Sequence, residues 1–470
     1  MEGKVEVLSL GGELIDRIIE YASSKAAYAE ARYMDLNSSG VSYKNGEFTG
    51  MQSVRESGYA FRVVNNSISI GYTDSEDWKD VKEAIDRAVS RSMAEGKNRI
   101  SRGTSIRDSW KVSQKKKIED MSVEDRIEIV RSNDRILESL GAKVRINAVS
   151  DKKIRQKYMN SVGSDIEGEI SRVFYFYMLG VMENGDFEQS SEQYGASSGY
   201  EYIDSLNLEE KMTEDVRDLT ETLSAPSISP GKFDVIIGPE ISGIVAHESA
   251  GHPTEYDRII GREGALAGES FLTGKEFPFR VGSEQVNVVD DPSFEGSFGY
   301  YAYDDEGVKS RKRYLYRKGY TDEFILNRES AAILGVEPNG GGRSASWNLE
   351  PLARMSTTYI EPGQYGFEEL FEDVRRGIYI KSYTEWNIDD VRFNEKYVGK
   401  EAYIIQDGDL TGRVRRPVIE TNTINFYSSV DAVGRDLEFN AGMCGKGDPM
   451  QGVDVWMGGP HVRLRDMYIQ

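Results

Sequence analysis

The chain is poor in cysteine and histidine, two residue types that commonly bind transition metals. Of its 470 residues, one is cysteine, Cys444, and three are histidine. A single cysteine excludes a disulfide within the chain and fits a reducing compartment such as the cytoplasm. Any metal chemistry based on these side chains must therefore use very few positions.

Long apolar runs are also absent. Nowhere do about 18 apolar residues follow one another, so we expect no transmembrane helix and no membrane partner. Residues 1–7 lack the apolar stretch of a secretory signal. Both observations indicate a cytoplasmic protein.

Basic residues are fewer than acidic residues. Lys and Arg total 58 against 79 Asp and Glu, which gives a net charge of -21. Such a chain repels phosphate backbones, so we expect no direct nucleic-acid partner. Hydrophobic residues make up 39%, enough for packed cores and too much for intrinsic disorder.

The first 225 residues alternate helical and strand patterns. Apolar residues recur at helical spacing, and Ser122 is a predicted N-cap with Asp125 in the first turn. Strand patterns include a hairpin that turns at Asn65-Asn66. The helices are predicted at 10–24, 74–95, 122–140 and 206–223, and the strands at 53–73 and 143–199. This pattern predicts an α+β fold that opens with an α/β-type domain, 1–225, built on a mixed sheet.

A Pro, Ser and Gly segment at 224–231 then marks a predicted boundary. Beyond it, short β-rich runs dominate, and helical patterns are confined to 239–252 and 366–377. The strands are predicted at 279–290, 313–316, 403–405, 413–422 and 453–457. We therefore expect 226–470 to form a large, mostly antiparallel β domain.

Two of the three histidines, His247 and His252, lie in the helix predicted at 239–252, with Glu248 beside the first. In H-E-x-x-H zinc proteases, a spacing of four residues leaves the histidines only about 40° apart around a helix. The spacing of five here leaves about 140° in a regular helix. Either a π-bulge brings the rings together, or the helix ends at Gly251 and His252 lies on the next loop.

A catalytic zinc site takes three protein ligands and keeps one position open. Candidates for the third ligand are Cys444 in a glycine-rich loop, His461, Glu255 and Asp257. A lone cysteine is more often a small buried apolar residue, and His461 favours a structural role. The acidic groups 290–291 and 304–306 could bind calcium, but turn chemistry and solvated charge explain them equally well.

The sequence resembles the TldD/PmbA family, and specifically its TldD-like catalytic branch. The resemblance spans most of the chain and is strongest from about residue 234 onward. It is carried by motifs in a fixed order, at 247–253, 288–296, 303–307, 343–347, 351–355, 360–363 and 443–446. Several motifs in one order are more specific than any one of them.

The resemblance implies a zinc metallopeptidase with His247, His252 and Cys444 as Zn²⁺ ligands and Glu248 as the catalytic base. In that mechanism zinc lowers the pKa of a bound water from about 15.7 to about 7. Glu248 takes the water's proton as the water attacks the peptide carbonyl, and passes it to the leaving amine.

The resemblance further implies that the substrates are unfolded or extended peptides, which reach a site enclosed by a dimer and can pair with a sheet edge. The partner is a second copy or an inactive paralogue, and 1–225 is expected to build the dimer and the substrate channel. The alternative is a non-catalytic peptide-binding or regulatory subunit, similar to a gyrase modulator, with a structural metal site closed by a fourth ligand.

Overall fold

The structure is a computed structural model that describes residues 11–96, 99–263 and 268–470. Residues 1–7, whose composition argues against a secretory signal, lie outside the described residues. Among the described helices, none is long and apolar enough to cross a membrane.

The N-terminal half is built on one seven-stranded sheet with the order β3-β2-β1-β5-β6-β4, and β7 also pairs with β6. The strands are β1 (Tyr28–Lys44), β2 (Glu47–Val64), β3 (Ile68–Thr73), β4 (Arg107–Lys111), β5 (Val144–Asn160), β6 (Asp165–Glu183) and β7 (Asp186–Ala196). Neighbours are antiparallel except β4 and β6, which are parallel. The predicted mixed sheet is confirmed.

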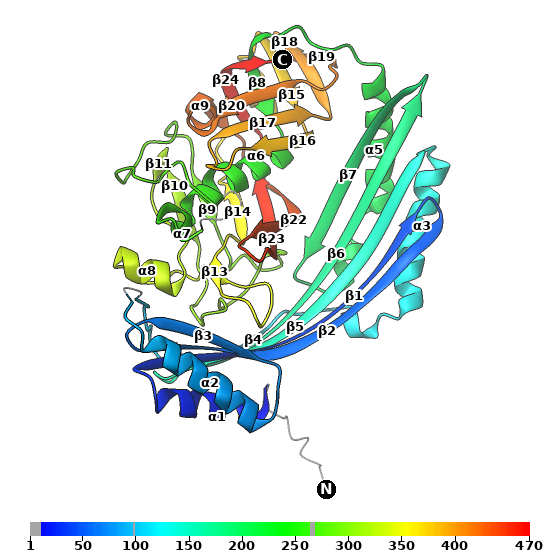
Figure 1. Cartoon of the computed structure of the whole chain (residues 1–470). Helices are drawn as coiled ribbons and strands as arrows, with labels where there is room; N and C mark the ends of the chain where they lie inside the picture. Colours follow the sequence, from blue (N-terminus) through cyan, green and yellow to red (C-terminus); the bar gives the residue numbers. More distant parts are fainter. Residues whose placement is uncertain (1–10, 97–98, 264–267) are drawn as a thin grey trace.

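Helices cover this sheet at both ends (Figure 1). They are α1 (Gly12–Ser23), α2 (Trp78–Ser92), α3 (Val123–Ser139), α4 (Glu201–Asp204) and α5 (Leu208–Leu223). The first two pack on β1 to β3 around one apolar core, and α3 and α5 pack on β5 to β7 around another. Ser122 caps α3 in a reciprocal capping box with Asp125, as its position predicts.

Two sheets of six and nine strands and a short ribbon form the C-terminal half. The six-stranded sheet contains β9 (Val288–Asp290), β10 (Arg313–Arg317), β11 (Tyr320–Thr321), β14 (Thr357–Ile360), β22 (Glu438–Lys446) and β23 (Gln451–Gly459). The nine-stranded sheet contains β8 (Gly231–Ile237), β15 (Arg376–Ile380), β16 (Tyr383–Ile388), β17 (Asn394–Gly399), β18 (Ala402–Gln406), β19 (Asp409–Arg413), β20 (Val418–Asn422), β21 (Val430–Val433) and β24 (Val462–Ile469). A two-stranded ribbon joins β12 (Gly342–Arg343) to β13 (Leu352–Ala353). Most pairs are antiparallel, so the α+β class is confirmed.

The expectation that helices are confined to two places is wrong. Besides α6 (Pro239–Val245), the structure contains α7 (Tyr256–Ile259), α8 (Arg328–Leu334) and α9 (Thr423–Ser429). The sequence does signal α8, because Asn327 caps it and Gly335 follows it at φ 78°. The helix expected at 366–377 is a single 3-10 turn, Glu368–Leu370, followed by β15. Parallel pairing of β15 with β8 buries its apolar side chains in the sheet, and this outweighs the local pattern.

Buried ion pairs join the two halves, and the long N-terminal strands curve beside the C-terminal sheets (Figure 1). Arg172 bonds Asp454 at 2.5 Å, and Arg62 bonds Glu306 at 2.6 Å. A cavity of about 240 Å³ lies at this contact, lined from both halves by residues that include Phe174. The expected boundary near residue 225 falls between α5 and β8, and the division into 1–225 and 226–470 stays a prediction.

Candidate metal centre

A π-helical turn brings the two helical histidines together. The regular helix α6 widens into a π-helix at Ala246–Gly251, and a 3-10 turn follows at His252–Thr254. The extra residue in the turn compensates for the spacing of five, so the ring centroids of His247 and His252 lie 5.0 Å apart. The π-bulge alternative is therefore confirmed, and the alternative that places His252 on a loop is wrong.

Buried polar groups stabilise this wide turn by binding the oxygen atoms that it displaces. Tyr316 donates its hydroxyl proton to the carbonyl of Ser249 at 2.8 Å, and Thr254 donates to the carbonyl of Ala250 at 2.8 Å. The Ser249 hydroxyl in turn donates to the buried carboxyl group of Glu395. The contacts leave these polar atoms paired inside the core, as buried groups require.

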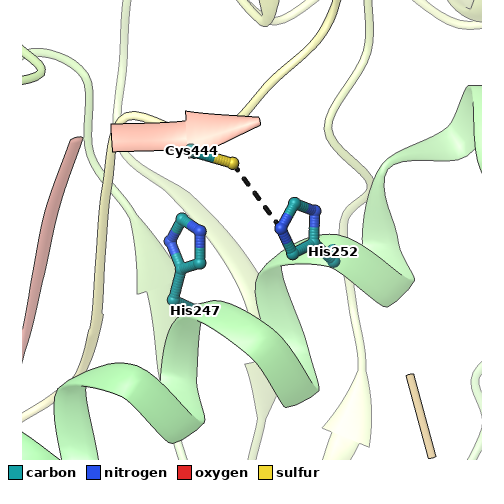
Figure 2. A group of neighbouring side chains, drawn as sticks. All are labelled: His247, His252 and Cys444. Atoms are coloured by element: carbon teal, nitrogen blue, oxygen red, sulfur yellow. Dashed lines mark hydrogen bonds between the residues drawn. The ribbon is translucent and has the colours of Figure 1, made fainter. Parts of the chain in front are cut away.

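Cys444 lies within the edge strand β22, so the expectation that it lies in a glycine-rich loop is wrong. From this strand it reaches the two histidines (Figure 2). Its Sγ lies 3.5 Å from Nε2 of His252, and one ligand atom from each of His247, His252 and Cys444 lies within 4.8 Å of the others. All three side chains are buried. Over the described ranges, this is the one group of three or more His, Cys, Asp or Glu side chains placed closely enough to hold a metal ion.

The protonation of this cluster suits a metal ion. Burial lowers the pKa of both His247 and His252, which favours the neutral form that binds metals. Burial raises the pKa of the Cys444 thiol, but His252 and Arg354 outweigh it and bring the pKa down to about 7. Nδ1 of His247 is buried and has no hydrogen-bond partner among the described residues. A set of two imidazoles and a thiolate fits zinc.

Glu255 orients the ring of His252 from outside the cluster. Its carboxylate lies 3.0 Å from Nδ1 of His252, which fixes the ring so that Nε2 faces Cys444. Arg258 and Lys446 both bond the same carboxylate oxygen, at 2.6 and 3.2 Å. Asp257 is bound by Lys446 at 2.7 Å. Neither acid joins the cluster, so the geometry favours Cys444 among the candidates for the third ligand.

His461 lies in a separate hydrogen-bond network. Its Nδ1 contacts Asp436 at 2.7 Å, and its Nε2 contacts the hydroxyl of Tyr379 at 2.9 Å. Both ring nitrogens are thus occupied, and the structural role expected for this histidine agrees with its contacts.

The acidic groups considered for calcium already have bonding partners within the protein. Asp290 pairs with the fully buried Arg313 at 2.5 Å, and Glu306 pairs with Arg62. Asp304 accepts hydrogen bonds from backbone N–H groups. Solvated charge is the wrong explanation for these three carboxyl groups, because all are buried; they hold loops and the two halves together.

Glu248 follows His247 within the π-turn, and its Oε2 lies 4.0 Å from Nε2 of His252. The same oxygen accepts a hydrogen bond from Nη1 of Arg392 at 2.8 Å. The sequence does not reveal this partner, because the two residues are 144 positions apart in the chain. The base predicted from the resemblance therefore lies between the ligand cluster and a guanidinium group.

Comparison with known proteins identifies the family. Three family models match consecutive parts of the chain: PmbA/TldA metallopeptidase domain 1 at 29–94, the central domain at 116–223, and the C-terminal domain at 230–470. The last match alone covers more than half of the sequence and includes all three residues of the cluster.

Relatives extend over nearly the whole chain. A metalloprotease from Methanocaldococcus jannaschii is 31% identical over 457 residues, covering 96% of this chain and 98% of the relative. One from Methanothermobacter thermautotrophicus is 29% identical over 463 residues, with 98% and 99% covered. The crystal structure of TldE from Thermococcus kodakarensis shares the fold, with a TM-score of 0.77 at 17% identity and 97% and 99% coverage. The chain belongs to the TldD/PmbA family of metallopeptidases.

Proposed function

We propose that the protein is a zinc-dependent peptidase, with His247, His252 and Cys444 as the metal ligands and Glu248 as the general base. One observation carries this proposal: three buried ligand atoms converge within 4.8 Å beside a glutamate. A relative from Saccharolobus solfataricus named zinc metalloprotease TldD homolog, 27% identical over 322 residues, adds support; the match covers 68% of this chain and 69% of the relative.

The chemistry follows from these positions. A zinc ion held by the three ligands supplies Lewis acidity and acidifies water. Glu248 accepts the proton of the attacking water and later delivers it to the amine that leaves. Glu255 keeps His252 in the tautomer whose Nε2 is free to bind metal.

We propose that the substrate is an extended or unfolded peptide. Strand β22 ends its sheet, so one side of its backbone has no strand partner within the described residues. An extended chain can pair with this edge through main-chain hydrogen bonds, with little sequence preference. Because Cys444 lies on the same strand, pairing there places the peptide next to the cluster.

We propose, as the family resemblance implies, that a cytoplasmic dimer, of like chains or with an inactive paralogue, encloses the site. Support comes from the tips of two hairpins, β1–β2 and β6–β7, which expose large apolar side chains at the same end of the sheet: Phe48, Met51, Met182 and Phe187. Sedimentation of the wild type and of a Phe48→Lys, Met182→Lys variant tests this. We expect the variant to dissociate, and a monomeric wild type would contradict the homodimer.

Elemental analysis tests the metal site. We expect about one zinc per chain in the wild type and loss of zinc in His247→Ala, His252→Ala and Cys444→Ala. His461→Ala is the matched control: like His252, this histidine has contacts at both ring nitrogens, but it lies outside the cluster, so zinc should remain. Wild-type protein that stays metal-free after zinc loading would overturn the proposal.

Glu248→Gln separates catalysis from structure. It should keep the zinc and lose about 10²-fold or more in turnover of an unfolded peptide, because no base remains to take the proton. Unchanged turnover would exclude Glu248 as the base. A zinc-loaded wild type that binds peptides without cleaving them would instead support the regulatory-subunit alternative.

A further inference from the structure

Arg392 lies at an unusual place in the fold. It belongs to the turn between β16 and β17, and it projects its guanidinium group onto Glu248, with 13% of the side chain exposed. Nη1 bonds Oε2 of Glu248 at 2.8 Å.

Most of this guanidinium group has no protein acceptor. A guanidinium carries five N–H donors. Among the described residues, Nη1 is the one guanidinium nitrogen of Arg392 with a hydrogen-bond partner, and Nε is buried without one. Buried donors in folded proteins are nearly always satisfied, so such a deficit beside a general base needs an explanation. A substrate oxygen atom is an acceptor that would satisfy it.

The backbone holds Arg392 in place at a conformational cost. Its φ is 63°, in the left-handed region that residues other than glycine rarely adopt. The turn is fixed by Asp389, whose carbonyl accepts from the N–H of Arg392 and whose carboxylate binds the N–H of Phe393 at 2.7 Å. Thr423 donates to the carbonyl of Arg392 at 3.2 Å. Strained residues held by their surroundings occur preferentially at functional sites.

We propose that Arg392 binds the oxygen of the scissile carbonyl and stabilises the negative charge that develops on it. This inference rests on the proposed peptidase function. As water attacks the carbonyl carbon, the C=O π electrons move onto oxygen and the water's proton moves to Glu248. Arg392 donates hydrogen bonds to that oxygen and transfers no proton. When the C–N bond breaks, the electron pair leaves with nitrogen, which takes the proton back from Glu248, and the carbonyl reforms.

A preorganised cation of this kind acts on the transition state more than on the bound substrate. Removing it should therefore lower kcat and leave KM nearly unchanged. Arg392→Gly is the variant of choice, because glycine adopts φ 63° without strain and leaves room for a free guanidinium ion. Folding should be preserved or improved while the chemistry is lost.

The experiment uses the full zinc-loaded chain and a fluorogenic peptide with a blocked C-terminus. For Arg392→Gly we expect kcat to fall about 10²-fold or more, with KM within about threefold of wild type. Zinc content and Tm should be maintained. Guanidinium chloride at tens of millimolar should restore about tenfold or more of the lost activity, and sodium chloride should not. Arg416→Gly is the matched control, since Arg416 also has a positive φ, 47°, but pairs with Glu188.

A second measurement does not depend on turnover. Calorimetry should show that a phosphinic peptide, whose anionic oxygen mimics the developing charge, binds Arg392→Gly more weakly by the same factor as kcat/KM falls. The isosteric reduced peptide without that oxygen should bind both proteins equally.

Two results would overturn the inference alone: kcat within threefold of wild type, or a defect limited to KM and to peptides with a free C-terminal carboxylate. The second would mean that Arg392 binds that carboxylate. Failure of the proposed function itself looks different, because the zinc-loaded wild type would then show no cleavage for any variant to lose.

Discussion

The hydroxyl of Tyr316 donates a hydrogen bond to the main-chain carbonyl of Ser249, 2.8 Å away, in the middle of the π-helical turn. Both residues are fully buried, so water cannot replace this donor. The relationship links strand β10 to the one turn whose geometry brings the two histidines together.

Tyr316→Phe should therefore weaken both the fold and the metal site. Leaving a buried carbonyl without a partner costs about 1–3 kcal/mol in the free energy of unfolding. The turn can then relax toward a regular helix, which separates the histidine rings and lowers zinc affinity. Denaturation and zinc titration measure the two effects. Tyr314→Phe, which removes a hydroxyl that bonds Glu361 instead, should leave zinc affinity unchanged.

Glu255→Gln should lower the affinity for zinc, although it removes none of the proposed metal ligands. Loss of a carboxylate that orients a metal-binding histidine typically costs about 10–100-fold in affinity. Competition with a chelator measures this. Asp436→Asn is the control, because Asp436 holds His461 through the same type of contact outside the cluster. Equal zinc affinity in wild type and Glu255→Gln would contradict the role assigned to Glu255.

Cobalt substitution can show directly that a thiolate binds the metal. Protein reconstituted with Co²⁺ should display an intense near-ultraviolet charge-transfer band from the Cys444 thiolate. The band should vanish in Cys444→Ser, while the weaker visible bands shift. If the wild type lacks the charge-transfer band although cobalt is bound, Cys444 is not a ligand.

The buried carboxyl group of Glu395 should make stability depend on pH. Burial raises its pKa to about 7 from an ordinary 4.5, although hydrogen bonds from Ser249 and Tyr397 lower it. The folded protein thus holds this proton more tightly than the unfolded chain does. The free energy of unfolding should fall as the pH rises from about 4.5 to about 7, by about 3 kcal/mol.

Glu395→Gln should remove that share of the pH dependence, since an amide does not titrate. Urea unfolding at pH 5 and at pH 8 measures it as the difference between wild type and variant. A variant that loses as much stability over this range as the wild type would show that other groups account for the effect.

The sequence predicts the fold well where local signals agree with tertiary packing. The capping box of Ser122 and Asp125 and the hairpin at Asn65-Asn66 depend on neighbouring residues, and both predictions are confirmed. The helix expected at 366–377 is wrong because pairing with β8, more than a hundred residues earlier in the chain, determines the conformation of β15.

The sequence likewise predicts one part of the candidate site and not another. The spacing of His247 and His252 left two alternatives, a π-turn or a loop after Gly251, and the structure shows the π-turn. The place of Arg392 beside Glu248 could not be predicted, since it depends on how a distant hairpin packs against the turn. The spacing of neighbouring residues limits the local backbone geometry to a few alternatives, whereas it does not indicate which distant segments contact each other.

The long separation in sequence between the proposed ligands should also make the site form late in folding. His252 and Cys444 are 192 residues apart, and their contact depends on the pairing of β22 with β23 and on the packing of α6 against both strands. Contacts between such distant segments close large loops and form slowly in folding. A partly folded chain therefore lacks a complete set of ligands. The metal centre, and any activity that depends on it, should therefore be a property of the completed tertiary structure alone.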